Sequence, residues 1–457
     1  MKIKAKIISA SLLLCLSCIS AKAEVSFSGN SSEVIAIDAE KNTGLNRIYV
    51  ARTVQGLSIT ALPMNGKAAT SWQQYDNRGG GFAVDVEGVR QEGLNLVLDN
   101  PKGDTGYLLT YPDGTYYFWL TDYSAHPLQM QSLELPTEQD CSMIALTLTG
   151  QGDAIHYYSI NGRQLTLDRN IKVSFNTLEW NSEELQWKQK QAEELTQNVG
   201  QLFISPAPLC NTTFTATGDR FLEAWDAQQT IESTTWDCTV VAVNTTAERT
   251  NKPGEGSNQM GAGQDSGELG GSAPADVSFK AYITDAVLHS EWQFATDAQF
   301  EDITHRFNQQ DLDYTFTEEG TVYVRFVGSN FDGSCTAESD VYTVSIGASD
   351  LKIPNAFSPG ASEGVNDIWK VSYKSLLEFK CWIFNRYGTQ LFYFDNPEDG
   401  WDGKYNGKLV PPGVYFYVIE AKGSDGKQYK KGGDINILRY NPNGRNNGGS
   451  GGGGTTE

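Results

Sequence analysis

The sequence predicts an all-β protein built from tandem β-sandwich domains. Short segments that alternate apolar and polar residues, and that are rich in aromatic side chains, recur along the chain with turn residues between them. Long amphipathic helices are nearly absent. A length of 457 residues corresponds to about three domains of average size, and the spacing of the segments favours four or five.

The first 23 residues have the organisation of a secretory signal peptide. Three lysines are followed by an apolar stretch over residues 7–16, and Ala21-Lys22-Ala23 supplies small residues before Glu24. We therefore expect an exported protein that begins at Glu24. The residues before Cys18 fit a lipobox poorly, so lipid attachment at that cysteine is the less favoured alternative.

The predicted mature chain is strongly acidic. The whole sequence has 35 basic and 56 acidic residues, and removal of residues 1–23 takes away four lysines, which leaves 31 basic residues and a net charge of −25. Such a surface repels phosphate backbones and anionic lipids, so we expect neither nucleic acid nor a membrane surface as a partner. Because no comparable apolar stretch recurs, direct membrane insertion is not expected.

Residues 24–133 are expected to form the first sandwich. Two aromatic-rich segments, 106–111 and 115–120, are separated by Pro112-Asp113-Gly114. Proline, aspartate and glycine in this order favour a tight turn, so the sequence predicts a hairpin here.

Residues 134–249 are again rich in predicted strands. They form either one domain or two small sandwiches that meet near Pro206. Residues 183–197 fit two structures: their charges suit a solvated helix, whereas Leu185 and Trp187 also suit a strand.

Residues 250–275 contain seven glycines and almost no large apolar side chain. A structureless run of this length is unusual inside one domain, so the sequence predicts a flexible linker. The Gly- and Asn-rich residues 441–457 are expected to be a disordered tail, because they have nothing to bury.

Residues 276–349 are expected to form an immunoglobulin-like or PKD-like sandwich. Trp292 is the candidate core tryptophan. The pattern Gly320-x-x-Tyr-Val324, and Asn330 ahead of Cys335, resemble PKD-type modules of bacterial surface proteins.

Residues 350–440 carry six motifs in a fixed order. They are Ile353-Pro-Asn-Ala-Phe-Ser-Pro359, Gly364-Val-Asn-Asp-Ile-Trp369, Phe379-Lys-Cys-Trp-Ile-Phe-Asn-Arg-Tyr-Gly388, Gly400-Trp-Asp-Gly403, Pro412-Gly-Val-Tyr-Phe-Tyr-Val-Ile419 and Gly433-Asp-Ile-Asn-Ile-Leu438. This set closely resembles the type B C-terminal domain of the type IX secretion system of Bacteroidota, also called the gliding-motility-associated C-terminal domain.

The resemblance implies a small antiparallel β-sandwich that serves as a sorting domain. It implies translocation across the outer membrane by the type IX machinery and retention at the cell surface. It also implies a partner, an outer-membrane barrel of the PorP/SprF type.

The segment 413–419 has apolar or aromatic residues on both of its faces. Val414, Phe416 and Val418 share one face, and Tyr415, Tyr417 and Ile419 share the other. One face fills the core, and the other is expected to be a docking face, with Tyr415, Tyr417 and Trp401 as the candidate docking residues. In the alternative, both faces lie in a two-sheet core or against the preceding domain.

The loop of residues 359–367 departs from the pattern that it resembles. The related loops read Pro-Asn-Gly-Asp-Gly-x-Asn-Asp and look like a cation loop, whereas this chain lacks the first Asn and Asp and has one inserted residue. Glu363, Asn366 and Asp367 are the candidate Ca²⁺ ligands. A turn held by Asx hydrogen bonds is the alternative.

Five cysteines remain in the predicted mature chain: Cys141, Cys210, Cys238, Cys335 and Cys381. Export permits disulfides, and the odd number leaves at least one thiol free or intermolecular. Cys210 and Cys238 are the predicted pair, because they are closest in sequence and flank one β-rich stretch. Cys381 alternates with Phe379 and Ile383, which predicts a buried free thiol.

No catalytic motif is present, and no cofactor is expected. Four histidines are scattered without metal-ligand spacing, and the sequence has no nucleophile elbow, phosphate loop or dinucleotide fingerprint. The sequence therefore favours a non-enzymatic structural or adhesive surface protein. One alternative is an accessory component of the secretion or gliding apparatus. A second is an exported hydrolase or carbohydrate-binding module, in which Trp72 or Trp225 would stack on sugar instead of lying in a core.

Overall fold

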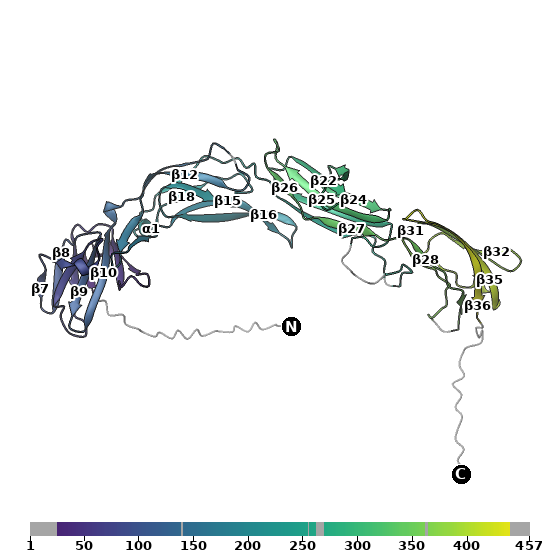
Figure 1. Ribbon diagram of the computed structural model, residues 1–457, viewed down its shortest axis with the longest axis horizontal. Helices are drawn as coiled ribbons and strands as arrows, with labels where there is room; N and C mark the ends of the chain where they lie inside the picture. The colour runs from purple at the N-terminus through teal and green to yellow at the C-terminus, as the bar shows by residue number, and fades with distance from the viewer. Residues whose placement is uncertain (1–24, 139, 255, 262–268, 362–363, 439–457) are drawn as a thin grey trace, which may run out of the picture.

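The computed structural model describes residues 25–138, 140–254, 256–261, 269–361 and 364–438. Four β-rich domains follow one another along an elongated, curved molecule, with the first domain at one end and the C-terminal domain at the other (Figure 1). Strands dominate the described residues, so the predicted all-β class is confirmed. The predicted signal peptide and the tail 441–457 lie outside the described residues.

The first domain is a sandwich of a four-stranded and a six-stranded sheet. The four-stranded sheet has the order β1 (Val25–Gly29), β4 (Leu57–Ala61), β8 (Asn95–Asp99), β7 (Arg90–Glu92). The six-stranded sheet has the order β2 (Val34–Asp38), β3 (Arg47–Ala51), β10 (Gly114–Asp122), β9 (Thr105–Tyr111), β5 (Ser71–Tyr75), β6 (Val84–Asp85). Three 3₁₀ turns, η1 (Ser31–Glu33), η2 (Gly80–Phe82) and η3 (Tyr123–Ala125), join the strands.

The predicted hairpin of the first domain is confirmed. Strands β9 and β10 pair antiparallel, with Tyr111 opposite Gly114 across the Pro-Asp turn. The six-stranded sheet also contains one parallel pair, β3 with β10, which requires a crossover between them.

The second domain consists of three sheets and one short helix. They are β11 (Gln129–Glu134), β12 (Ile144–Gln151) and β17 (Gly200–Ile204); β13 (Ile155–Tyr158) and β14 (Gln164–Leu167); and β16 (Gln186–Thr196), β15 (Ile171–Asn181), β18 (Thr215–Thr217) and β19 (Thr230–Glu232), with α1 (Arg220–Ala224). The ambiguous residues 183–197 are mostly the strand β16. Strands on both sides of Pro206 contribute to one core, which joins Leu146, Ile204 and Phe214.

The first two domains share a hydrophobic core. Trp119 and Tyr75 lie on the side of the six-stranded sheet that is turned away from the four-stranded sheet. They belong to one cluster with Ile155, Tyr157 and other buried residues of the second domain. The first domain also has a core of its own between its two sheets. Since burial of apolar area is the main stabilising term in folding, the shared cluster should stabilise the two domains in contact with each other.

A buried ion pair lies at this junction. Arg169 and Asp219 have no exposed side-chain surface and are 2.8 Å apart. Arg169 also donates to the carbonyls of Asp153 and His126, while Asp219 caps helix α1 and accepts from Tyr123. All three guanidinium nitrogens of Arg169 therefore have acceptors, as a buried charge requires.

The third domain is a sandwich that includes residues on both sides of the predicted linker. One sheet has the order β20 (Val243–Arg249), β21 (Ala275–Ile283), β24 (Asp311–Phe316). The other contains β23 (Ile303–Phe307), β22 (His289–Ala295), β25 (Gly320–Ser329), β26 (Thr336–Glu338) and β27 (Tyr342–Ile346). The predicted core residue Trp292 is fully buried between the sheets.

The prediction of a linker over 250–275 is wrong for the described part of that segment. Strands β20 and β21 pair antiparallel, so the segment is a long loop within the third domain. Arg249 donates to the carbonyls of Gly270 and Ser272 and holds the base of the loop together. Residues 257–260 extend to the C-terminal domain, where Ser257 and Asn258 donate to Glu398. The described part of this glycine-rich segment has almost no large apolar side chain to bury, so hydrogen bonds of polar side chains and backbone groups fix its position instead.

The C-terminal domain has one main sheet of five strands. Its order is β29 (Ala356–Phe357), β36 (Gln428–Ile437), β35 (Gly413–Gly423), β31 (Leu376–Phe384), β32 (Gln390–Phe394). The pairs are antiparallel except for β29 with β36. Two small sheets, β28 (Asp350–Lys352) with β30 (Ser372–Lys374) and β33 (Lys404–Tyr405) with β34 (Lys408–Leu409), complete the domain.

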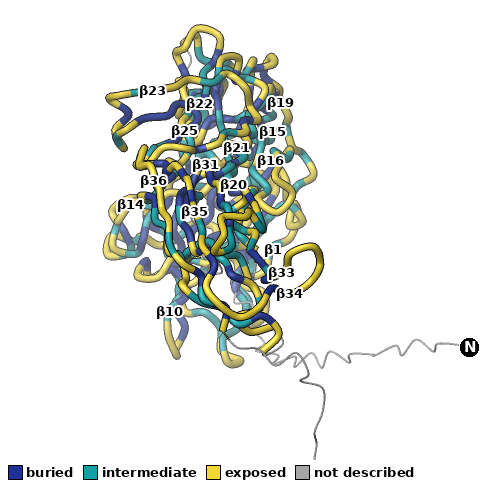
Figure 2. Tube along the Cα trace, turned by 90° about the vertical axis from the view of Figure 1, so that its right-hand side faces the viewer, coloured by how far each residue is buried: buried dark blue, intermediate teal, exposed yellow. Residues whose placement is uncertain are grey.

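Viewed along the long axis of the molecule, buried segments occupy the interior and exposed loops surround them (Figure 2). Within the described part of the chain, no helix has the length and apolar character needed to cross a membrane.

Candidate functional site: the C-terminal sheet and the interdomain disulfide

Three of the C-terminal motifs meet in the core of their domain. The indole of Trp369 donates to the carbonyl of Pro354 at 2.7 Å. The backbones of Trp369 and Trp401 exchange two hydrogen bonds, of 2.8 and 3.0 Å. A Cβ at Gly400 would lie 2.7 Å from the carbonyl oxygen of Trp369, so only glycine permits this approach.

Two of the three predicted docking residues are core residues, and the prediction is wrong for them. Trp401 is fully buried and Tyr415 is 8% exposed. Their rings pack edge to face, and the hydroxyl of Tyr415 donates to the carbonyl of Pro411 at 2.8 Å. Neither side chain is available to a partner.

Tyr417 is half-buried on the same inner face. Its ring packs on Trp369 with 5.5 Å between centroids, and it lies close above Gly433, where an added Cβ would come within 2.6 Å of the hydroxyl. Burial raises the pKa of Tyr417. Tyr417 therefore covers the edge of the core, and its role in docking remains a prediction.

The opposite face of the sheet is open. Val414, Phe416 and Val418 on β35 are 48, 43 and 42% exposed. Trp382 lies opposite Val418 and Phe384 lies opposite Phe416 on β31, and Tyr393 of β32 lies opposite Trp382. We call these six residues the outer face. Strands side by side bring these side chains into one apolar and aromatic surface.

The other end of the same face is charged. Lys380, Glu420 and Lys430 lie opposite one another across three strands, next to Glu378 and Lys422. The even-numbered positions of β35 thus change from apolar to charged along the strand. Glu420 and Lys422 were the sequence signal that these positions face solvent, because residues two apart in a strand share a face.

The candidate cation loop is held by backbone hydrogen bonds. The carboxylate of Asp367 accepts from the backbone N–H groups of Gly360 and Gly364, at 2.8 and 2.7 Å, and Asn366 adopts a left-handed conformation with φ of 54°. Hydrogen bonds to an Asp side chain therefore hold the loop, which fits the alternative of a turn held by Asx hydrogen bonds. Glu363 lies outside the described residues, so the Ca²⁺ site remains a prediction.

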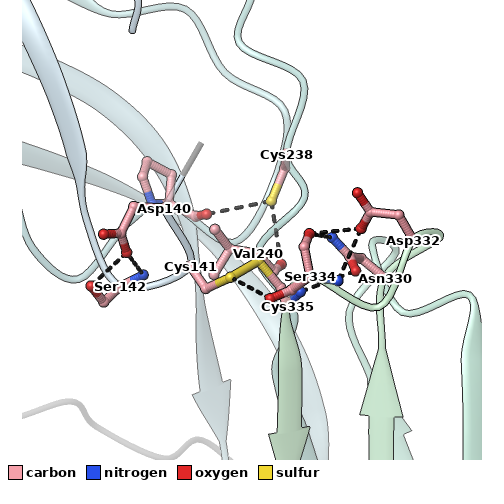
Figure 3. Close-up of a disulfide and its surroundings, with 10 residues drawn as sticks. Asp140, Cys141, Ser142, Cys238, Val240, Asn330, Asp332, Ser334 and Cys335 are labelled. Atoms are coloured by element: carbon pink, nitrogen blue, oxygen red, sulfur yellow. Dashed lines mark hydrogen bonds between the residues drawn. A yellow bond between two sulfur atoms is a disulfide. The ribbon is translucent and has the colours of Figure 1, made fainter. Parts of the chain in front are cut away.

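The disulfide of the structure is not the predicted one. Cys141 bonds Cys335, 194 positions away (Figure 3). Cys210 and Cys238 are free thiols. The prediction used proximity in sequence, but Cys141 lies in the loop that the second domain turns toward the third. Cys238 instead donates its thiol to the carbonyls of Pro208 and Val240.

The remaining thiols are in environments that suppress reactivity. Burial raises the pKa of Cys238 to about 11 and that of Cys381 to about 12. Since the thiolate is the reactive form, both groups are poor nucleophiles at neutral pH. Cys381 is fully buried and unbonded, which confirms its prediction as a buried free thiol.

Two of the four histidines have structural contacts. His126 bonds Asp104 at 3.0 Å, and His305 stacks on Phe307. No group of three His, Cys, Asp or Glu side chains capable of holding a metal occurs among these residues. Trp72 is buried in the first domain, and Trp225 packs on Tyr123, so neither offers an open stacking surface for sugar.

The comparisons with known proteins match two parts of the chain. Residues 134–233 match the fibronectin type III domain, and residues 351–437 match the CHU_C type IX secretion signal domain. No curated protein matches the chain.

Solved structures give only weak likenesses. A tetra-tandem repeat from the extending region of a large adhesion protein is 12% identical, covers 91% of this chain and 99% of its own, and has a TM-score of 0.21. The FN1–FN3 domains of chicken CNTN1 are 11% identical over 68% of this chain and 99% of their own, with a TM-score of 0.24. Dimeric latent PorU from Porphyromonas gingivalis is 10% identical over 71% of this chain and 35% of its own, with a TM-score of 0.15.

The motifs that converge on Trp369 and Trp401 are thus those of a known export module. The chain carries a CHU_C type IX secretion signal domain at residues 351–437, preceded by a fibronectin type III-like domain at residues 134–233 within a series of β-sandwiches.

Proposed function

We propose that this protein is a non-enzymatic structural or adhesive protein, which the type IX system exports and which its C-terminal domain holds at the outer surface. The upstream β-sandwiches act as a spacer that carries the first domain away from the anchor. The observation that supports this most is the secretion signal domain at one end of an elongated series of fibronectin- and immunoglobulin-like modules.

The outer face is the proposed contact with the membrane-bound partner. It is an apolar surface on a domain whose opposite face already fills a core, and exposed apolar patches commonly mark interaction sites. An outer-membrane barrel of the PorP/SprF type is the proposed partner. The charged end of the same face would orient the domain on it.

Deletion of residues 350–438 tests the export assignment. We expect the truncated protein to accumulate in the periplasm, because it lacks every motif of the signal domain. Surface protease accessibility on intact cells measures this. Arrival of the truncated chain at the surface would contradict the assignment.

The variant Phe416→Asp tests the docking face. A carboxylate at this exposed position should leave the domain folded and weaken its retention, because docking would bury an unpaired charge. Tyr405→Asp, which places the same charge at an exposed aromatic residue of the β33–β34 pair outside the outer face, is the matched control. Co-purification of the barrel with each variant measures the effect, and equal retention would remove the outer face from this role.

The same co-purification distinguishes a protein that the type IX machinery exports from a component of that machinery. Recovery with the secretion machinery at a fixed stoichiometry would make the protein a permanent component of the apparatus instead of its cargo.

A further inference from the structure

The disulfide joins two domains at a particular point of the chain. Cys141 lies between β11 and β12 of the second domain, and Cys335 lies between β25 and β26 of the third. Figure 3 shows the two sulfur atoms bonded where these domains approach each other. The bond therefore closes a loop that contains most of both domains.

A second contact supports the same junction. The tip of the β15–β16 hairpin reaches the third domain, where the indole of Trp187 donates to the carbonyl of Tyr282 at 3.1 Å. Trp180, opposite Trp187 on the hairpin, packs on the ring of Tyr282 with 5.2 Å between centroids. The second and third domains are thus joined at two places by groups other than the backbone that connects them.

Few strands of these two domains lie outside the closed loop. In the second domain only β11 precedes Cys141, and in the third only β26 and β27 follow Cys335. The covalent path from the first domain to the C-terminal domain can therefore pass from Cys141 directly to Cys335. Residues 142–334 are a side branch of that path.

We infer that the Cys141–Cys335 bond makes this protein a load-bearing spacer, in which tension between its ends bypasses residues 142–334. A pull that detaches β11 from β12, and then β27 and β26 from β25, reaches the sulfur–sulfur bond next, and the bond stops further extension. The second domain and most of the third then stay folded at forces that would unravel an uncrosslinked chain. The inference rests on the proposed function, because surface anchoring at one end supplies the tension.

The nearby thiols leave this bond in place. Cys238 lies close to the disulfide (Figure 3), but its thiol is engaged with two carbonyls. Burial raises its pKa to about 11, so it has little of the thiolate that exchange requires.

Single-molecule force extension of the chain from Glu24 to Glu457 tests the inference. Full unfolding of the oxidised chain should release less contour length than unfolding in the presence of a reductant. The difference should be roughly 640–700 Å, from a sequence separation of 194 residues at about 3.3–3.6 Å each. The double variant Cys141→Ser/Cys335→Ser should show the longer release without a reductant. Cys381→Ser is the matched control and should behave as the oxidised parent.

Equal contour lengths with and without reductant would overturn the inference. A longer release from oxidised Cys381→Ser than from the oxidised parent would overturn it as well. Exchange of the bond with Cys238 would close a shorter loop and so reduce the difference in contour length, and Cys238→Ser would restore the full difference. That result would also contradict the inference. None of these results depends on export. Failure of the surface-accessibility test would instead leave the bypass intact and remove its source of tension.

Discussion

Arg169 shows how a single buried charge is accommodated at the junction of the first two domains. Its guanidinium has one carboxylate partner, Asp219, and two carbonyl acceptors, and water does not reach it. A buried ion pair of this kind adds little net stability compared with apolar residues of the same volume, but removal of one partner is costly. The pair therefore ties the orientation of three chain segments to one another.

Replacement of Arg169 by methionine should destabilise the protein by about 3–5 kcal/mol, because Asp219 would remain as a buried, uncompensated charge. Chemical denaturation measures the loss. Arg47→Met is the control: its partner Asp38 is largely exposed, so we expect a change of at most about 1 kcal/mol. Similar losses in the two variants would contradict the role assigned to burial.

His126 should make stability depend on pH. The hydrogen bond to Asp104 raises the pKa of His126 above its ordinary value of about 6.5. A raised pKa in the folded state stabilises the protein below about pH 6.5, and this contribution is lost as the pH rises through the folded value. The Tm should therefore fall as the pH rises from about 6.5 through the folded-state pKa, and Asp104→Asn should reduce that fall. An unchanged slope in Asp104→Asn would assign the pH dependence to another group.

At the scale of elements, strand β35 carries the most information about function. Its odd positions, Tyr415 to Ala421, line the core, and its even positions, Val414 to Lys422, face outward. The two faces are chemically similar at the start of the strand and different at its end. Because adjacent positions alternate between the core and solvent, the same substitution should destabilise the domain at an odd position and have little effect on its stability at an even one.

Tyr415→Asp and Phe416→Asp should differ sharply in stability. At position 415 a carboxylate would be buried without a partner and the hydrogen bond to Pro411 would be lost, so we expect about 3–5 kcal/mol of destabilisation. At position 416 the carboxylate reaches water, and a change within about 1 kcal/mol is expected. Thermal melts of the full chain compare them. A large loss at position 416 would place that residue in a packed interface.

The polar contact between the third and C-terminal domains should weaken in acid. Burial alone would raise the pKa of Glu398, but hydrogen bonds from Ser257, Asn258 and Tyr373 outweigh it and hold the pKa below the usual range. A lowered pKa stabilises the contact above the unfolded value of about 4.3, and the contribution is lost as the pH falls through the folded value. The hydrogen-exchange protection factors of residues 256–260, which are corrected for the intrinsic pH dependence of exchange, should fall in that window, and Glu398→Gln should remove the fall. Protection factors that do not change with pH would contradict this.

The sequence predicted elements well where the local pattern was sufficient. The alternation in 106–120 identified a hairpin, and the six C-terminal motifs identified the export domain. Predictions that needed long-range pairing failed. The glycine-rich residues 250–275 looked like a linker because β20 and β21, which enclose them, could not be paired from sequence alone. Tyr415 was assigned to an exposed face, although it lies in the core, because only the first half of β35 was considered.

At the scale of the whole molecule, the disulfide between Cys141 and Cys335 connects two domains and not two strands of one domain. A bond between residues 194 positions apart cannot be read from spacing, since any of the five cysteines could meet once the domains are placed. The same arrangement leaves three thiols whose state can be measured.

Alkylation of the unreduced, denatured protein should label Cys210, Cys238 and Cys381 only. Mass spectrometry of a digest should also recover the Cys141 and Cys335 peptides as one linked species. Labelling of Cys381 alone would instead show that Cys210 and Cys238 are bonded, as their spacing predicted.

The polar contact between the third and C-terminal domains also determines where the molecule can bend. The first and second domains share a core, and a disulfide joins the second and third domains. The contact between the third and C-terminal domains depends instead on small polar groups, such as the side chains of Ser272 and Ser375 and the carbonyl of Gly347. Interfaces of this small, polar kind usually permit relative motion. Bending should therefore concentrate next to the anchor, so that the three upstream domains swing together as a single arm.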